Sequence, residues 1–102
     1  MIGRYGFVYL AHCPALDLYK IGFSAQLKAR IGQLNREWKE RFALLDAVES
    51  ESGIVLERMA HTCLAKYRAM RNHREYYAFS DKTDAQLLFD GAVKDRDTDL
   101  AH

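Results

Sequence analysis

Residues 5–24, YGFVYLAHCPALDLYKIGFS, give the strongest indication of the fold in this chain. It contains two runs rich in aromatic and branched apolar residues, at 5–11 and 18–23, and these residue types favour β-strands. The segment between them holds the chain's single proline and predicts a connection that lets the two runs pair as a hairpin. Lys20 lies within the second run, where burying an uncompensated charge is costly, so we expect it to have a partner or a chemical task.

The residues after the hairpin predict helices that alternate with strands. Ser24 suits a helix N-cap, and the apolar residues at 27, 31 and 34 share one face of a helix over 25–36. Apolar patterning then predicts a strand over 42–49, a helix over 54–69, a polar loop at 70–74, a short strand over 75–80 and a helix over 81–95. The order β-β-α-β-α-β-α predicts the α/β class, with a small mixed β-sheet and helices packed on one side of it.

Length and composition predict one folded domain over residues 1–95, followed by a flexible tail at 96–102. The hydrophobic fraction of 49% is typical of a globular chain. No apolar run approaches the roughly 20 residues that a membrane span requires, and the N-terminus does not resemble a signal peptide. The two cysteines, Cys13 and Cys63, do not suggest a disulfide framework. We therefore expect a cytoplasmic protein without a membrane partner.

The charge is unevenly distributed along the chain. Residues 1–78 carry 12 basic and 8 acidic side chains, whereas residues 79–102 carry 3 and 6. An ordinary solvated surface accounts for this difference, and a basic face turned towards a polyanion is the alternative.

Five elements in order resemble the GIY-YIG nuclease superfamily, and in particular its branch described as a phage-type DNA-binding domain. The pattern reads VY…YKIG…R…ExxxH…E[WFY][FY] and covers roughly residues 5–80. Its counterparts here are Val8-Tyr9-Leu10, Tyr19-Lys20-Ile21-Gly22, Arg30, Glu57 with His61, and Glu75-Tyr76-Tyr77. The resemblance implies a GIY-YIG-like fold and a hydrolase that cleaves DNA phosphodiester bonds with a divalent metal, Mg²⁺ or Mn²⁺.

The resemblance also implies roles for individual residues. Tyr9 corresponds to the tyrosine that assists the attacking water, and Lys20 stands where many members carry a second tyrosine. Lys20 would lower the pKa of Tyr9, hold a phosphate, or do both. Arg30 would stabilise transition-state charge and Glu57 would bind the metal. His61 would relay a proton or hold a phosphate.

Other side chains have weaker expectations. Candidate DNA contacts are Tyr19, Lys28, Arg36 and Arg58. We interpret Glu75 as a cap or a partner of Arg74, and Tyr76 and Tyr77 as core residues.

The favoured function is therefore a metal-dependent endonuclease. Two alternatives stay open: a non-catalytic DNA-binding module on the same fold, and a phage or prophage protein-interaction factor that uses the acidic helix at 81–95. The presence of Tyr9, Arg30 and Glu57 together favours the enzyme. Because no separate targeting domain is evident, DNA specificity would come from a homodimer, from a partner protein or from recognition of DNA structure.

Overall fold

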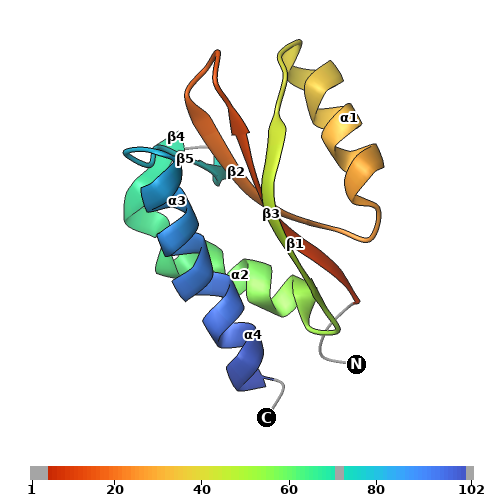
Figure 1. Ribbon diagram of the computed structural model, residues 1–102, viewed down its shortest axis with the longest axis vertical. Coiled ribbons are helices and arrows are strands. Elements are labelled where there is room, and N and C mark those ends of the chain that lie inside the picture. The colour runs from red at the N-terminus through yellow and green to blue at the C-terminus, as the bar shows by residue number, and fades with distance from the viewer. Residues whose placement is uncertain (1–4, 71–72, 101–102) are drawn as a thin grey trace.

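The hairpin predicted near the N-terminus forms the centre of the sheet in the computed structural model, which describes residues 5–70 and 73–100 (Figure 1). Strands β1 (Gly6–Cys13) and β2 (Leu18–Ser24) pair antiparallel from Phe7 opposite Ser24 to Cys13 opposite Leu18. Ser24 was predicted to cap the first helix. It is instead the last residue of β2, and its hydroxyl accepts a hydrogen bond from the Gln26 amide at 3.0 Å.

The remaining elements follow the predicted order with an additional strand and an additional C-terminal helix. These elements are α1 (Leu27–Trp38), β3 (Ala43–Ser50), α2 (Gly53–Cys63), the 3₁₀ turn η1 (Ala65–Tyr67), β4 (Arg68–Met70), β5 (His73–Tyr77), α3 (Lys82–Phe89), the π-helical segment η2 (Asp90–Lys94) and α4 (Asp95–Leu100). The additions are β4 and α4. The strand predicted over 75–80 lies at 73–77, and the helix predicted over 81–95 is divided into α3 and the π-helical segment.

The sheet has the strand order β3-β1-β2-β5-β4. The predicted α/β class with helices on a sheet is confirmed. All four pairings among the described strands are antiparallel, where a mixed sheet was predicted. Helix α2 ends at Cys63 rather than at residue 69, because the chain tightens into η1 and then turns to form β4 alongside β5. Leu64 and Tyr67 still pack on the core, which explains why their spacing resembled a longer helix.

Helices cover both faces of the sheet, and the prediction that they lie on one side is wrong (Figure 1). β1 explains this arrangement, because its neighbouring residues Val8 and Tyr9 are both fully buried. Side chains alternate along a strand, so a strand that is apolar on both faces requires cover on both. Leu10 joins the core beneath α2 and α3, whereas Ala11 joins the core beneath α1.

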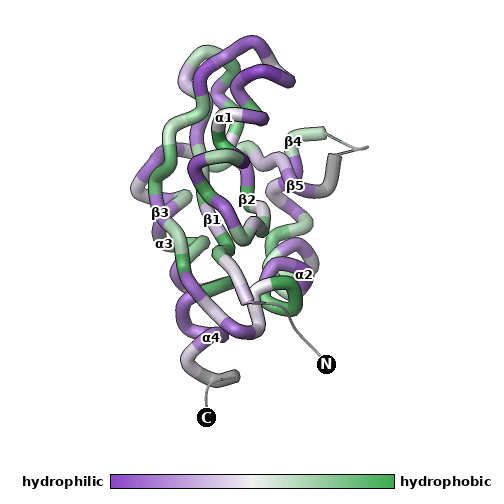
Figure 2. The backbone as a smooth tube through the Cα atoms, turned by 90° about the vertical axis from the view of Figure 1, so that its right-hand side faces the viewer, coloured by the Kyte–Doolittle hydropathy of each residue, from purple (hydrophilic) through white to green (hydrophobic). Residues whose placement is uncertain are grey.

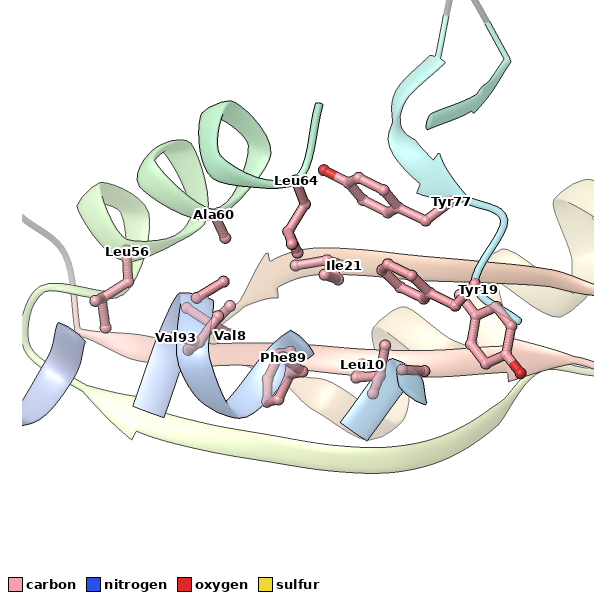
Figure 3. Close-up of a cluster of buried hydrophobic side chains, with 13 residues drawn as sticks. Val8, Leu10, Tyr19, Ile21, Leu56, Ala60, Leu64, Tyr77, Phe89 and Val93 are labelled. Atoms are coloured by element: carbon pink, nitrogen blue, oxygen red, sulfur yellow. The ribbon is translucent and has the colours of Figure 1, made fainter. Parts of the chain in front are cut away.

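The larger core lies between the sheet and the helices α2 and α3 with η2 (Figure 3). Its central members are Val8, Leu10, Ile21, Leu56, Ala60, Leu64, Phe89 and Val93. The smaller core lies beneath α1 and contains Tyr9, Ala11, Cys13, Leu34, Phe42 and Tyr76. This division matters for function, because it places Tyr77 in the larger core and Tyr9 in the smaller one, each next to ionisable groups.

The C-terminal helices are tied to β3 by polar side chains. Asp46 accepts hydrogen bonds from Gln86 at 2.5 Å and from Lys94 at 2.6 Å, and Ser50 donates to Asp97 at 2.6 Å. Helix α4 occupies most of the stretch that was expected to be a flexible tail, and residues 101–102 lie outside the described part. The tube around α4 is largely hydrophilic (Figure 2). No helix among the described residues is long and apolar enough to cross a membrane.

Candidate active site at the edge of β2

Tyr9 lies on β1 directly opposite Gly22 of β2. A Cβ atom at Gly22 would lie 2.6 Å from the Tyr9 hydroxyl oxygen, so the glycine of YKIG is needed to make room for the Tyr9 ring. The ring is fully buried, and its hydroxyl makes no hydrogen bond of good geometry with the described residues. A buried polar group without a partner costs stability, which marks this hydroxyl as a functional candidate.

The environment of Tyr9 favours its neutral form. Burial raises the pKa of Tyr9 to about 12, and the nearby Arg30 guanidinium opposes only part of that rise. The prediction that Lys20 lowers the pKa of Tyr9 is therefore wrong. The cation that acts on Tyr9 is Arg30 of α1.

Lys20 is 1% exposed and lies on β2 opposite Tyr76 of β5. Its ammonium Nζ is 2.7 Å from Glu75 Oε2 and 4.6 Å from the centre of the Tyr76 ring. Glu75 is therefore the charged partner that we expected for a lysine within an apolar strand. Burial alone would raise the pKa of Glu75, but the hydrogen bond and charge of Lys20 outweigh it, and His61 and Arg30 lower it further. Glu75 therefore stays ionised at neutral pH.

These groups surround an open pocket of about 350 Å³. Its lining combines two cations, two carboxylates and two aromatic rings, which belong to Lys20, Arg30, Glu37, Trp38, Glu75 and Tyr76. The Trp38 indole Nε1–H donates a hydrogen bond to the Tyr76 hydroxyl at 2.8 Å. Strand β5, which is distant in sequence, thus meets the consecutive elements β2 and α1 at one concave site.

A second polar group lies on the other face of the sheet. His61 of α2 is buried, and its Nδ1 is 2.5 Å from the hydroxyl of Tyr77, while its Nε2 is 3.6 Å from Glu57 Oε2. Burial raises the pKa of Tyr77 to about 12; Arg68 opposes this rise, whereas the charges of Glu57 and Glu75 add to it.

The structure thus divides the predicted catalytic residues. It gathers Tyr9, Lys20 and Arg30 near the pocket, and it places Glu57 and His61 beside Tyr77. Glu75 connects the two groups electrostatically, because it pairs with Lys20 and its charge also acts on Tyr77.

Sequence analysis underrated three pocket residues, Glu37, Trp38 and Glu75. The one available signal for Glu75 was the need of Lys20 for a counter-ion, since the E-Y-Y motif gives Glu75 no partner by itself. The partner proposed from sequence, Arg74, has a side chain outside the described part of the structure.

The four predicted DNA contacts differ in exposure and in location on the structure. Tyr19 is 2% exposed and stacks on His12 with ring centres 4.3 Å apart, so it presents no surface to DNA, and that prediction is corrected. Lys28 and Arg36 are exposed and line a shallow hollow on the outer face of α1. Arg58 is exposed on α2, away from that hollow.

The described residues contain no group of three or more His, Cys, Asp or Glu side chains that could hold a metal ion. A protein-built metal cage is therefore not a feature of this part of the chain. The acidic groups next to the candidate catalytic residues are the exposed Glu37, Glu75, whose side chain is 47% exposed, and Glu57, whose side chain is 19% exposed.

Comparison with known proteins places this geometry in a family. The family model described as T5orf172 domain matches residues 6–90, from the start of β1 to the end of α3. No curated protein and no solved structure matches the chain significantly. The predicted resemblance to a phage-type domain is confirmed at this level, and membership of the GIY-YIG superfamily stays a prediction.

Proposed function

The chain belongs to the T5orf172 domain family, and we propose that it is a metal-dependent endonuclease that hydrolyses DNA phosphodiester bonds at the pocket beside β2. One observation carries the proposal. The buried Lys20 and the half-buried Arg30 line an open, charged pocket, and Arg30 also acts on the buried hydroxyl of Tyr9, which makes no hydrogen bond of good geometry among the described residues.

The two cations suit a phosphodiester and the charge that develops on it. Arg30 presents a planar, permanently charged fork that can donate to two phosphate oxygens at once. Lys20 adds a compact charge, and its ion pair with Glu75 holds the ammonium at the pocket wall before substrate arrives. Donors that are already in place where negative charge grows lower the barrier without reorganisation.

Tyr9 would act as a neutral phenol, because its pKa of about 12 keeps the proton on at neutral pH. Its oxygen can accept a hydrogen bond from the attacking water, and its proton can be donated to a phosphate oxygen. In the reaction, water adds to phosphorus, one P–O ester bond breaks, and the leaving oxygen takes up a proton. Tyr9 would thus orient the water rather than remove its proton as a phenolate.

The carboxylates present fit a divalent ion that is held only partly by the protein. Mg²⁺ prefers oxygen ligands and keeps several waters, so one or two carboxylates together with substrate oxygens suffice. The residue that would hold it at the pocket is Glu75, whereas the family resemblance implies Glu57, which lies beside His61 on α2. When bound, the ion supplies Lewis-acid charge at a phosphate oxygen.

The test is cleavage of supercoiled plasmid, branched DNA and single-stranded DNA with Mg²⁺ or Mn²⁺, against the same reactions with EDTA. Wild type is compared with Glu57→Gln, Glu75→Gln and, as a matched control, the exposed Glu40→Gln. We expect metal-dependent cleavage that the control keeps and that at least one of the other two variants loses.

Two results would contradict the proposal. DNA retention without cleavage by wild type would support the non-catalytic DNA-binding module. The absence of both cleavage and retention would instead support the protein-interaction factor.

A further inference from the structure

The pocket contains more than hydrolysis of a phosphate requires. Lys20 and Arg30 provide the charge that a phosphodiester needs, yet the pocket also has a wall formed by Glu37, Trp38 and Tyr76. We call Trp38 and Tyr76 the aromatic wall, and Glu37 borders it. A neutral planar group attached to the phosphate would occupy the space beside it.

Trp38 is held in place as a platform. Its indole Nε1–H is bound to the Tyr76 hydroxyl at 2.8 Å, and the two rings meet edge to face with centres 5.0 Å apart. Phe42 lies against the same indole, with ring centres 6.3 Å apart. Trp38 nevertheless stays partly exposed, at the last residue of α1. A fixed, partly exposed aromatic ring beside two cations is the arrangement that stacks nucleobases and tracks their backbone.

The acidic groups of the pocket add chemical selectivity. Glu37 is exposed in the last turn of α1, and Glu75 lies across the pocket on β5. A carboxylate can accept two hydrogen bonds from guanine, from its ring N1–H and its amino group, whereas thymine has no amino group and offers only its ring N3–H. Phosphate alone would be repelled by Glu37, so this carboxylate favours a ligand that carries N–H donors.

We propose that the aromatic wall binds an unpaired, amino-bearing nucleobase next to the phosphate held by Lys20 and Arg30. A base inside an intact duplex has its faces stacked and its pairing edge occupied, and it cannot reach the indole. The preferred substrate is therefore DNA with an extruded base, as in a bulge or a single-stranded junction. This inference rests on the proposed function and names its substrate class.

Trp38 is the only tryptophan of the chain, so its fluorescence reports directly on the pocket. Three labelled duplexes are titrated in EDTA: one with a single bulged guanine, one with an abasic site in the bulge, and one fully paired. We expect the bulged guanine to quench Trp38 emission and to bind about tenfold more tightly than the abasic bulge, as the loss of one stacked base implies.

Variants locate the effect on the aromatic wall. Anisotropy of the labelled DNA is measured for Trp38→Ala, which removes the ring, and for Trp38→Phe, which keeps an aromatic face and most of the packing. Glu37→Gln should reduce the preference for a bulged guanine over a bulged thymine, whereas the neighbouring exposed Glu40→Gln should leave it unchanged.

The outcomes separate this inference from the proposed function. Equal binding of the three duplexes, without base-dependent quenching, overturns the base site. If the wild type and Trp38→Ala also cleave paired duplex as fast as bulged DNA, the nuclease stands without such a site. If no DNA is bound or cleaved at all, both proposals fail.

Discussion

Two buried tyrosines on opposite faces of one sheet show how the same side chain is used in two ways. Burial raises the pKa of both Tyr9 and Tyr77 to about 12. The Tyr77 hydroxyl is satisfied by His61 at 2.5 Å, beneath α2. The Tyr9 hydroxyl has no hydrogen-bond partner among the described residues, and Arg30 and an open pocket lie nearby.

The difference separates a structural group from a functional one. A satisfied buried hydroxyl contributes modestly to stability, whereas an unsatisfied one costs about 1–3 kcal/mol. Such a cost is typically found where a ligand will supply the missing partner. This difference is consistent with the proposed chemistry on the α1 face and with a structural role for Tyr77 beneath α2.

The largest effect should come from the charge on the α1 face. Arg30→Ala should lower the cleavage rate by about 10²–10³-fold, because one fixed donor to the transition state is lost. The fold should persist, since the Arg30 side chain is only half-buried and donates to Gln33 of the same helix at 2.8 Å. The measurement is the plasmid nicking rate together with thermal unfolding. The exposed Arg41→Ala is the matched control, and an equal loss in both variants would argue against a specific role for Arg30.

Gly22→Ala should disturb the α1 face through packing. The added methyl would lie 2.6 Å from the hydroxyl oxygen and 2.7 Å from Cζ of the rigid Tyr9 ring, so the ring must move. We expect the free energy of unfolding to fall by about 1–3 kcal/mol and cleavage to fall with it. Gly32→Ala on α1 is the control, because its nearest contact is the Arg36 guanidinium at 3.6 Å and alanine favours a helix. Urea unfolding measures the stability of both variants, and equal stabilities would contradict the prediction.

Removing the hydroxyl of Tyr77 and removing that of Tyr9 should have different effects on stability. Tyr77→Phe breaks the bond to His61 and should lower the free energy of unfolding by about 1 kcal/mol. Tyr9→Phe removes a group that has no partner in the described structure, so stability should stay equal or rise while cleavage falls. Urea unfolding of the two variants and their nicking rates test the comparison, which fails if both variants lose stability alike.

The smallest expected effect is on how the free energy of unfolding changes at acidic pH. The folded-state pKa of Glu75 lies below its ordinary value of 4.5, so the ion pair with Lys20 contributes stability above that value. This stability is lost as the pH falls through the lowered pKa. The effect is small, because the Glu75 side chain is 47% exposed and solvent screens it. Glu75→Gln should reduce the difference in stability between neutral and acidic solution, measured by urea unfolding, and an unchanged difference would mean that the pair contributes nothing.

Local pattern was sufficient for much of the fold. The aromatic and branched runs around residues 5–24 predicted the β1–β2 hairpin, and the spacing of Leu27, Ile31 and Leu34 predicted α1 to within two residues at each end. Strand β3 was also predicted to within one residue at each end. These elements depend on neighbouring residues, which the sequence displays directly.

The amino-acid sequence identified the cations and hydroxyls on the central hairpin and the first helix. Their partners became known only from the packing of the elements in space. The ion pair of Lys20 with Glu75 spans 55 positions, and β5 must fold alongside β2 to form it. Burial raises the pKa of Tyr9, although the family resemblance had implied that Lys20 would lower it. Desolvation and long-range pairing depend on which segments meet in space, and no local pattern records that.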